Sequence, residues 1–440
     1  MAGDRPAESI VGVRFRRMEV VRLGCALFAV LLAGAVVGCG GGGSVAGINT
    51  AGNSGNTGNT GNTGNSGNTG NSGNSGNTGN TGSSNTGCSA AVTNCAWQQV
   101  ALASGMLGAS DVLQGLYAAH DGYLYSGTQR NGLWRAKISA IEANPASSSL
   151  WTRIDAGFAS DPNHGGVVYP SAWAEDSSGN LLVALGESPI GSFCTYCTVG
   201  KWNGSAWSFS NSPPGMRMSL QSMSLDGSGN LLVNDRQAAF YLSTDGGKTF
   251  GAPLVTDAYA AFGFTSGWVF TSKIINGQVY WGGEGPYMRS PLNMSSATPV
   301  FGGTGFKDNV TALASDGTAT TAPTYIVAGS RYEIATNDTV ARYSASTGAW
   351  ASLPISATFV RNSLVNGASA GELLGTYQVS NGGGVLRSTD GGVTWATYIA
   401  GLPAAEQLYV GFLTVSAVDG SKYLNAGAAS GGTTEIWFHP

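Results

Sequence analysis

The sequence predicts an all-β protein built from a repeated unit, and two observations support this. Glycine supplies 68 of 440 residues while charged residues make up only 10%, a composition that favours many turns over helices. Residues 243–250 (STDGGKTF) recur almost letter for letter at 388–395 (STDGGVTW). In such a segment the Asp side chain can accept a backbone hydrogen bond and the glycine pair accepts positive φ, so each copy predicts a hairpin turn.

Further hairpin-type turns recur at similar intervals along the chain and indicate that the repeated unit extends beyond these two copies. Neighbouring turns lie roughly 40–57 residues apart, which is the period of a β-propeller blade. A short β-rich run follows each turn, such as 123–125 (YLY) or 231–233 (LLV), and we interpret these runs as second strands. The turns are Asp121-Gly122, Ser178-Gly179-Asn180, Asp226-Gly227, Asn276-Gly277, Asp316-Gly317, Asn366-Gly367 and Asp419-Gly420.

Each fourth strand is predicted to begin at an aromatic residue. The sequence shows six such strands for the seven hairpin turns. The last repeat ends at the C-terminus without one, whereas 96–100 (AWQQV) carries an aromatic in the expected place. We therefore expect this N-terminal strand to complete a seventh blade and close the ring, which removes free sheet edges. Seven blades is the prediction, with six or eight as alternatives. The six aromatics are Trp151, Trp207, Phe250, Trp350, Trp395 and Phe301.

The two close copies of the turn resemble the Asp-box of BNR repeats, Ser-x-Asp-x-Gly-x-x-aromatic, which the sialidase-like propeller superfamily carries. In that superfamily the box is a structural turn between third and fourth strands, on the face away from the usual site. The resemblance covers the chain from about Cys95 to Pro440, and it implies structural roles for the matching residues. These are Ser243, Asp245, Gly247 and Phe250, and Ser388, Asp390, Gly392 and Trp395.

The N-terminus has the order of a secretory signal peptide. Several arginines precede an apolar run over 23–37, which is followed by Gly38-Cys39, and the run is short for a membrane span. Residues 36–39 (VVGC) resemble the bacterial lipobox, which implies cleavage before Cys39 and a diacylglyceryl group on that cysteine. Gly40 stands where an inner-membrane retention Asp would lie, so we expect an outer-membrane lipoprotein facing the periplasm or the cell surface. An ordinary signal peptide is the alternative, and Met18 is a second candidate start.

The sequence is predicted to comprise three segments. Residues 1–39 form the signal peptide, and 40–87 are almost entirely Gly, Asn, Thr and Ser, typical of a flexible uncharged spacer. Residues 88–440 form the propeller. An exported chain meets an oxidising compartment, so we expect two local disulfides, Cys88–Cys95 and Cys194–Cys197. A four-cysteine zinc site or a redox role for the second pair is a weaker alternative, and we expect no metal or other cofactor.

The few charges gather at corresponding repeat positions, after second strands and between blades. Loop ends on a rigid scaffold commonly form binding sites, so this face is the predicted functional face. Candidate catalytic carboxylates are Glu187, Asp235 and Glu284, since glycoside hydrolysis needs a carboxyl pair. Candidate ligand-binding residues, which include arginines able to clamp a carboxylate, are Arg130, Arg217, Arg236, Arg331, Arg361, Tyr377 and His164.

The sequence supports three functions of different classes. The first is binding of a glycan or an envelope protein through the charged face without turnover. The second is glycan cleavage, as a sialidase-like hydrolase or a polysaccharide lyase, although the Phe/Tyr-Arg-Ile-Pro motif of sialidases is absent from the first blade. The third is an envelope assembly scaffold. A net charge of −4 with no basic face argues against nucleic acid, and we expect a monomer.

Overall fold

A computed structural model describes residues 95–440 except 109–110, 130, 159–168, 187–196, 302–308, 332–339, 354, 356–357, 380–381, 404–408 and 428–432. The predicted signal peptide, the spacer and Cys88 lie outside the described residues and stay predictions. Within the part of the chain that is described, no helix is long and apolar enough to cross a membrane.

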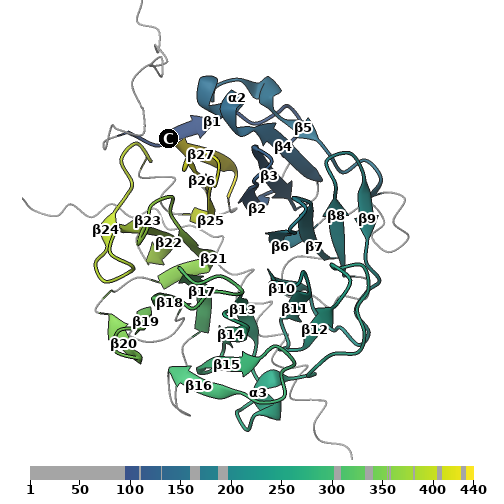
Figure 1. Ribbon diagram of the computed structural model, residues 1–440. Helices are drawn as coiled ribbons and strands as arrows, with labels where there is room; N and C mark the ends of the chain where they lie inside the picture. The colour runs from purple at the N-terminus through teal and green to yellow at the C-terminus, as the bar shows by residue number, and fades with distance from the viewer. Residues whose placement is uncertain are drawn as a thin grey trace, which may run out of the picture. The chain divides into compact units, whose positions relative to one another are not determined.

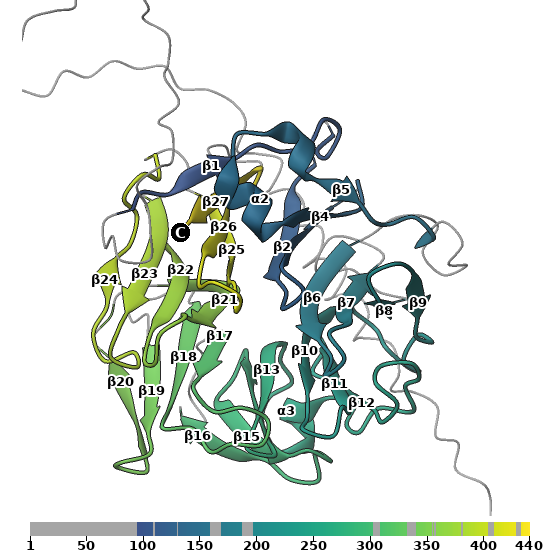
Figure 2. The same ribbon diagram turned by 45° about the horizontal axis from the view of Figure 1, so that its top comes forward.

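The strands form seven antiparallel sheets arranged around a ring, so the predicted seven-bladed β-propeller is confirmed (Figure 1). Six sheets have four strands and one has three. Seen from the tilted view, each sheet runs outward from the centre of the ring (Figure 2).

The blades follow one another along the chain. Blade 1 holds β2 (Leu113–Ala118), β3 (Tyr123–Thr128), β4 (Leu133–Lys137) and β5 (Thr152–Arg153). Blade 2 holds β6 (Tyr169–Glu175), β7 (Leu181–Gly186), β8 (Thr198–Trp202) and β9 (Trp207–Phe209). Blade 3 holds β10 (Leu220–Leu225), β11 (Leu231–Asp235) and β12 (Phe240–Ser243). Blade 4 holds β13 (Val269–Ile275), β14 (Gln278–Gly283), β15 (Tyr287–Pro291) and β16 (Thr298–Phe301).

The second half of the ring continues in the same order. Blade 5 holds β17 (Asn309–Ser315), β18 (Tyr325–Arg331), β19 (Val340–Ser344) and β20 (Ala349–Leu353). Blade 6 holds β21 (Thr358–Asn366), β22 (Leu373–Val379), β23 (Gly382–Ser388) and β24 (Ala396–Thr397). Blade 7 holds β25 (Tyr409–Val415), β26 (Lys422–Gly427), β27 (Glu435–His439) and β1 (Gln98–Val100). The helices within the described residues are α2 (Ile138–Ala143), the 3₁₀ turn η1 (Ser148–Leu150) and α3 (Ala258–Ala261).

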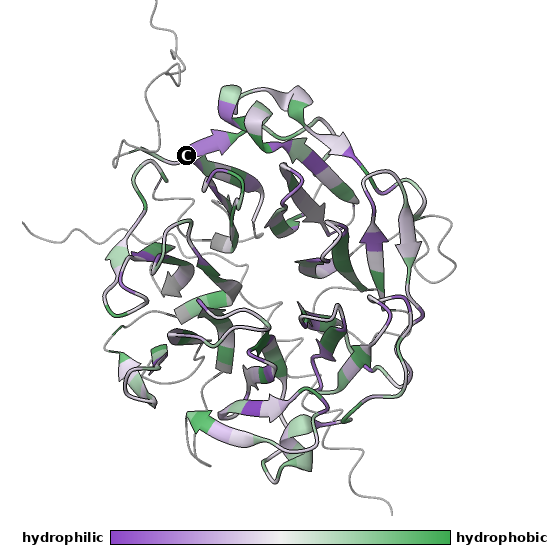
Figure 3. Ribbon diagram, viewed as in Figure 1, coloured by the Kyte–Doolittle hydropathy of each residue, from purple (hydrophilic) through white to green (hydrophobic). Residues whose placement is uncertain are grey.

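The hydrophobic core is divided among the interfaces between blades. Each of the seven clusters of buried residues joins one blade to the next, and hydrophobic residues recur along the strands of every blade (Figure 3). Successive side chains of a strand point to opposite faces of its sheet. In β7, Val183 therefore packs toward blade 1 and its neighbour Leu182 toward blade 3. Second strands are buried on both faces for this reason, which explains their continuous apolar runs.

The N-terminal strand closes the ring as the sequence predicts. β1 pairs antiparallel with β27, with Gln98 opposite Phe438, Gln99 opposite Trp437 and Val100 opposite Ile436. Trp97, just before β1, packs in the core between blades 6 and 7, while Val100 packs in the core between blades 7 and 1. The last blade therefore combines the two ends of the propeller.

The prediction that fourth strands open on an aromatic residue is wrong at Phe250. Blade 3 has three strands, and beyond its turn the chain makes only an isolated bridge between Phe240 and Val255. Phe250 is still buried in the core between blades 2 and 3, and its N–H donates to Asn211 Oδ1 at 2.7 Å. The aromatic position follows the packing between blades, so it marks the start of a strand at Trp207 but the end of one at Phe301.

The two repeated turns have the same hydrogen bonds. After β12, the Ser243 hydroxyl donates to Asp245 Oδ1 at 2.7 Å and accepts from the Gly247 N–H at 2.9 Å. Asp245 also accepts from the N–H groups of Lys248 and Thr249. These bonds favour the ionised carboxylate and hold the pKa of Asp245 well below its usual range.

The second copy lies between β23 and β24, as predicted for a turn between third and fourth strands. Ser388 donates to Asp390 and accepts from Gly392, and Asp390 accepts from the N–H groups of Val393 and Thr394. The hydroxyl and backbone bonds at Thr394 and the Ser388 hydroxyl outweigh desolvation and lower the pKa of Asp390 to about 2. Both aspartates therefore serve the conformation of their own turn.

Cys95 and Cys197 are both buried, with 5% and 0% of their surfaces exposed. Their expected partners, Cys88 and Cys194, lie outside the described residues. The two pairings therefore stay predictions.

A carboxyl pair joins blades 1 and 7 where the ring closes. Glu142 in α2 is hydrogen-bonded to Asp419 in the turn before β26, and desolvation, followed by this contact, raises the pKa of Glu142 to about 7. Desolvation opposes ionisation of Asp419, but its hydrogen bonds, first those to Ser421, outweigh it and lower the pKa of Asp419. As pH falls, Glu142 therefore takes up a proton before Asp419 does.

This pair predicts a loss of stability as pH rises. A carboxyl whose folded-state pKa lies above its unfolded value contributes stability below the unfolded pKa, and that contribution disappears as pH rises through the folded pKa. The window here is about 4.5 to 7. We expect Glu142→Gln, which keeps a hydrogen-bond donor but cannot ionise, to melt progressively higher relative to wild type between pH 5 and pH 8. Thermal melts across this range measure the difference, and a constant difference would contradict the assignment.

Candidate functional site

Propeller topology divides the connections between two faces. One face carries the links between second and third strands and the links between blades, and we call it the loop face; the opposite turn face carries the repeated turns. The candidates Arg217, Arg236 and Glu284 are all described residues on loop-face connections. Arg217 lies in the link between blades 2 and 3, Arg236 follows β11 of blade 3, and Glu284 follows β14 of blade 4.

Arg217 and Glu284 line the same pocket, which we call the blade 3–4 pocket. Its volume is about 300 Å³, which lies at the small end of the range for ligand sites. Its side chains come from the link between blades 2 and 3, the β11–β12 loop, the link between blades 3 and 4, and the end of β14. The lining residues are Arg217, Gln237, Thr256, Asp257, Ser266, Gly267, Trp268 and Glu284.

Trp268 is held from two sides. The guanidinium carbon of Arg236 lies 3.6 Å from the centre of a Trp268 ring, a cation–π contact that fixes the indole plane. The Trp268 backbone N–H donates to Glu284 Oε2 at 3.2 Å. Glu284 itself is exposed, so its carboxylate is held at the rim of the pocket by the backbone of the facing strand.

Asp257 forms the N-cap of α3. Its Oδ1 accepts from the Ala260 N–H at 3.0 Å, and its Oδ2 accepts from the Ser266 hydroxyl. A side-chain oxygen on a helix N-terminus satisfies an orphan N–H donor, so the sequence folds locally to place Asp257 here. Both carboxylate oxygens already accept a bond within the protein.

Asp235 does not line the pocket, although its neighbours do. It is 1% exposed, and its carboxylate accepts from the N–H of Ala239 at 2.9 Å and from that of Arg217 at 3.4 Å. Desolvation outweighs these bonds and raises the pKa of Asp235 to about 6. Asp235 thus ties the β11–β12 loop, which carries Gln237, to the link that carries Arg217.

The remaining candidates are not brought to this pocket. Tyr377 lies on β22 and packs against the core between blades 5 and 6. Arg331 and Arg361 belong to β18 and β21, on other blades, and their side chains are not described. Three further candidates lie outside the described residues: Glu187, Arg130 and His164.

Among the residues that the structure describes, no group of three or more His, Cys, Asp or Glu side chains could hold a metal ion. The blade 3–4 pocket combines the charged groups of Arg217, Asp257 and Glu284 with amide and hydroxyl groups around one indole ring. Such a lining suits a hydrophilic, uncharged or weakly charged ligand.

Fold and pocket together define a seven-bladed β-propeller with a polar pocket on its loop face. No protein-family model matches the sequence, and no curated protein matches it. Similar solved structures include the GH74 xyloglucanase of Xanthomonas campestris, with 17% identity and a TM-score of 0.55 over 78% of this chain and 53% of the enzyme. The Niastella koreensis GH74 enzyme gives 15% identity and a TM-score of 0.53 over 77% of this chain and 55% of the enzyme.

Propellers of other kinds have slightly lower identities and similar TM-scores. The extracellular domain of a putative one-component system from B. thetaiotaomicron gives 12% identity and a TM-score of 0.53 over 79% of this chain and 40% of that chain. YCF48 bound to a D1 peptide gives 13% identity and a TM-score of 0.51 over 79% of this chain and 98% of YCF48. The chain thus spans about half the length of the GH74 enzymes and less than half of the sensor domain. At these sequence identities the likeness shows the fold alone.

Proposed function

We propose that the protein binds a glycan in the blade 3–4 pocket and does not cleave it. The observation that carries this proposal is the pocket lining. Gln237, Ser266 and Thr256 offer amide and hydroxyl groups, Arg217 and Glu284 offer charged hydrogen-bond partners, and Trp268 offers a fixed ring. These are the groups that pair with sugar hydroxyls and stack on sugar rings.

The carboxylates of the pocket favour binding over cleavage. Hydrolysis needs two carboxyl groups that are free to act on the scissile bond. Asp257 uses both oxygens to cap α3 and hold Ser266, and Glu284 Oε2 accepts from the Trp268 backbone N–H, so both carboxylates of the pocket are already engaged within the protein. Glycan cleavage, for which the GH74 neighbours are the precedent in fold, is the alternative. An envelope protein or peptide ligand, as in the YCF48 complex, is a further one.

A glycan array probed with the full chain, followed by calorimetry on the best ligand, tests the proposal. Glu284→Gln and Gln237→Ala should each weaken binding by about 10-fold or more, because removing a hydrogen bond to a charged or buried group costs about 1.5 kcal/mol. The matched control is Arg289→Ala, an exposed residue on β15 of the same blade, which should leave affinity unchanged.

Three outcomes would overturn the proposal. The first is an array without glycan binding, and the second is equal affinity of the pocket variants and Arg289→Ala. The third is release of sugar from chromogenic glycosides that Glu284→Gln abolishes, which would establish the enzyme instead.

We further propose that the chain is exported and attached to the outer membrane through a lipid on Cys39, as a monomer in the periplasm or at the cell surface. The order of basic, apolar and small residues before Cys39 supports export. The spacer 40–87 would then separate the propeller from the lipid surface. The decisive experiment concerns Cys39 and is described in the Discussion.

A further inference from the structure

A second cavity occupies the centre of the ring. Its volume is about 390 Å³, and its walls come from the innermost strand of every blade: β2, β6, β10, β13, β17, β21 and β25. This central channel is separate from the blade 3–4 pocket, with which it shares no lining residue. None of the described site residues predicted from the sequence lines it.

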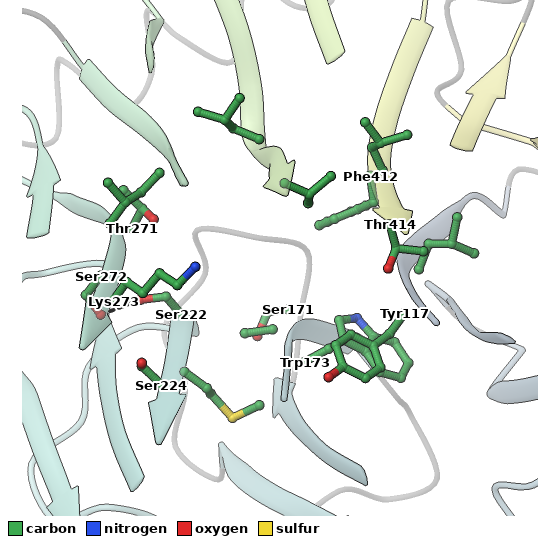
Figure 4. Close-up of a pocket in the computed structure, with 17 residues that line it drawn as sticks. Tyr117, Ser171, Trp173, Ser222, Ser224, Thr271, Ser272, Lys273, Phe412 and Thr414 are labelled. Atoms are coloured by element: carbon green, nitrogen blue, oxygen red, sulfur yellow. Dashed lines mark hydrogen bonds between the residues drawn. The ribbon is translucent and has the colours of Figure 1, made fainter. Parts of the chain in front are cut away.

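Lys273 on β13 is the one charged side chain among the described residues that line the channel. Figure 4 shows its side chain extending from β13 toward the middle of the cavity. Within the described part of the chain, its ammonium has no hydrogen bond and no ion pair. Loss of hydration lowers the pKa of Lys273, and no charged neighbour offsets that effect.

Hydroxyl groups beside Lys273 can add hydrogen bonds. Ser224 also lines the channel, and its Oγ accepts from the N–H of Ile274, the residue after Lys273, at 2.9 Å, so its own proton can still be donated. Across the channel, Thr414 Oγ1 accepts from the Ala118 N–H at 3.2 Å and keeps its proton in the same way. The Ser222 and Ser272 hydroxyls lie 2.7 Å apart and form one hydrogen-bonded cluster with Asn234 Oδ1, so they hold the β10–β13 contact instead.

We propose that the central channel binds a small oxyanion, with Lys273 as its counter-charge and Ser224 as a hydrogen-bond donor. An ammonium without a counter-charge in a confined, partly desolvated cavity is costly for folding, whereas a bound carboxylate or phosphate supplies the missing charge. The cavity is larger than an inorganic ion needs, and the Tyr117 and Trp173 rings lie on the side opposite Lys273 (Figure 4). The ligand therefore has room for an organic body that carries the oxyanion at one end.

Melting temperatures of the full chain test this site, with sodium phosphate and sodium glucuronate as probes at constant ionic strength. At a hundred-fold excess over Kd, a ligand of the folded state should raise the melting temperature by about 3–6 °C. A rise with both probes would identify a simple oxyanion ligand, and a rise with glucuronate alone would identify an organic acid.

Two variants of Lys273 separate a binding role from a structural one. Lys273→Met removes the charge and should melt above wild type without ligand, because it no longer confines an uncompensated ammonium; it should lose the response to both probes. Lys273→Arg should retain a response. Lys248→Met, at an exposed position in the turn after β12, is the matched control and should respond like wild type.

The result is independent of the glycan proposal, because Glu284→Gln should respond to the probes like wild type. The oxyanion site is excluded if neither probe raises the melting temperature of wild type, or if Lys273→Met responds as wild type does.

Discussion

Replacing Trp97 by alanine is expected to reduce the free energy of unfolding by about 3–5 kcal/mol, the usual cost of truncating a buried tryptophan. Trp97 is 3% exposed and packs between blades 6 and 7 with Leu374, Leu413 and Trp437. Its indole N–H donates to the Tyr398 carbonyl at 2.9 Å, and its backbone N–H donates to the Ala400 carbonyl at 2.8 Å.

This loss of stability is expected to impair closure of the ring as well. Domains have only about 5–15 kcal/mol of stability in total, and Trp97 anchors the strand that completes the last blade. β1 has three residues, and two of them are hydrophilic glutamines (purple in Figure 3). Pairing with β27 therefore depends on the buried residues Trp97 and Val100 at its two ends.

Two variants control this experiment, which is read by denaturant unfolding. Trp97→Phe keeps most of the buried ring but loses the bond to Tyr398, so it should cost clearly less than alanine. Gln99→Ala changes an exposed residue of the same strand and should lie within about 0.5 kcal/mol of wild type. If Trp97→Ala unfolded at the same denaturant concentration as Gln99→Ala, β1 would not be required for closure.

The fold was largely predictable because turns and second strands are encoded locally. A hairpin turn needs particular residues at fixed offsets, and a strand covered on both faces reads as a continuous apolar run, as β7 and β11 do. Fourth strands are different, because they pair on one side only and lie at the outer edge of the blade. Phe250 meets its packing requirement outside any strand, so its sequence alone could not distinguish a strand from a covering loop.

The candidate site was predictable only in part. Arg217 and Glu284 were found because propeller topology places equivalent loop positions on one face. Asp257, Ser266 and Trp268 were missed, because the long link that carries them is placed by α3 and by the Arg236–Trp268 contact. An Asp at position 257 ahead of a short helical run is an N-cap signal that could have indicated the first of them.

Residue type alone misleads in two opposite ways, at Asp235 and at Lys273. It predicts a site residue at Asp235, which does not line the blade 3–4 pocket, and it gives no prediction for Lys273, which lines the channel. Asp235 follows a second strand just as a ligand-facing carboxylate would, yet its oxygens turn inward to backbone N–H groups. Lys273 lies in the apolar pattern of a first strand, where a lone lysine gives no sign of the channel that seven separate strands enclose. Both outcomes depend on contacts between distant segments.

Cys39→Ser is expected to abolish attachment of the protein to the membrane. Stable anchoring requires more than one acyl chain, and a diacylglyceryl cysteine at the mature N-terminus would provide it. Substituting the sulfur removes the only atom of that residue to which a thioether-linked lipid can be joined, so the wild-type chain should incorporate a radiolabelled fatty acid and the variant should not. After cell fractionation, wild type should be found with the outer membrane.

The matched control is Cys25→Ser, which changes the other cysteine of the leader, inside the apolar run of residues 23–37. This variant should be labelled and fractionated like wild type, because cleavage before Cys39 would remove residue 25 from the mature protein. Label in Cys39→Ser, or a wild-type chain that remains soluble after export, would refute the lipid anchor and leave an ordinary signal peptide. The propeller itself should melt at the same temperature in all three proteins, because the spacer 40–87 separates both cysteines from the first strand in the sequence.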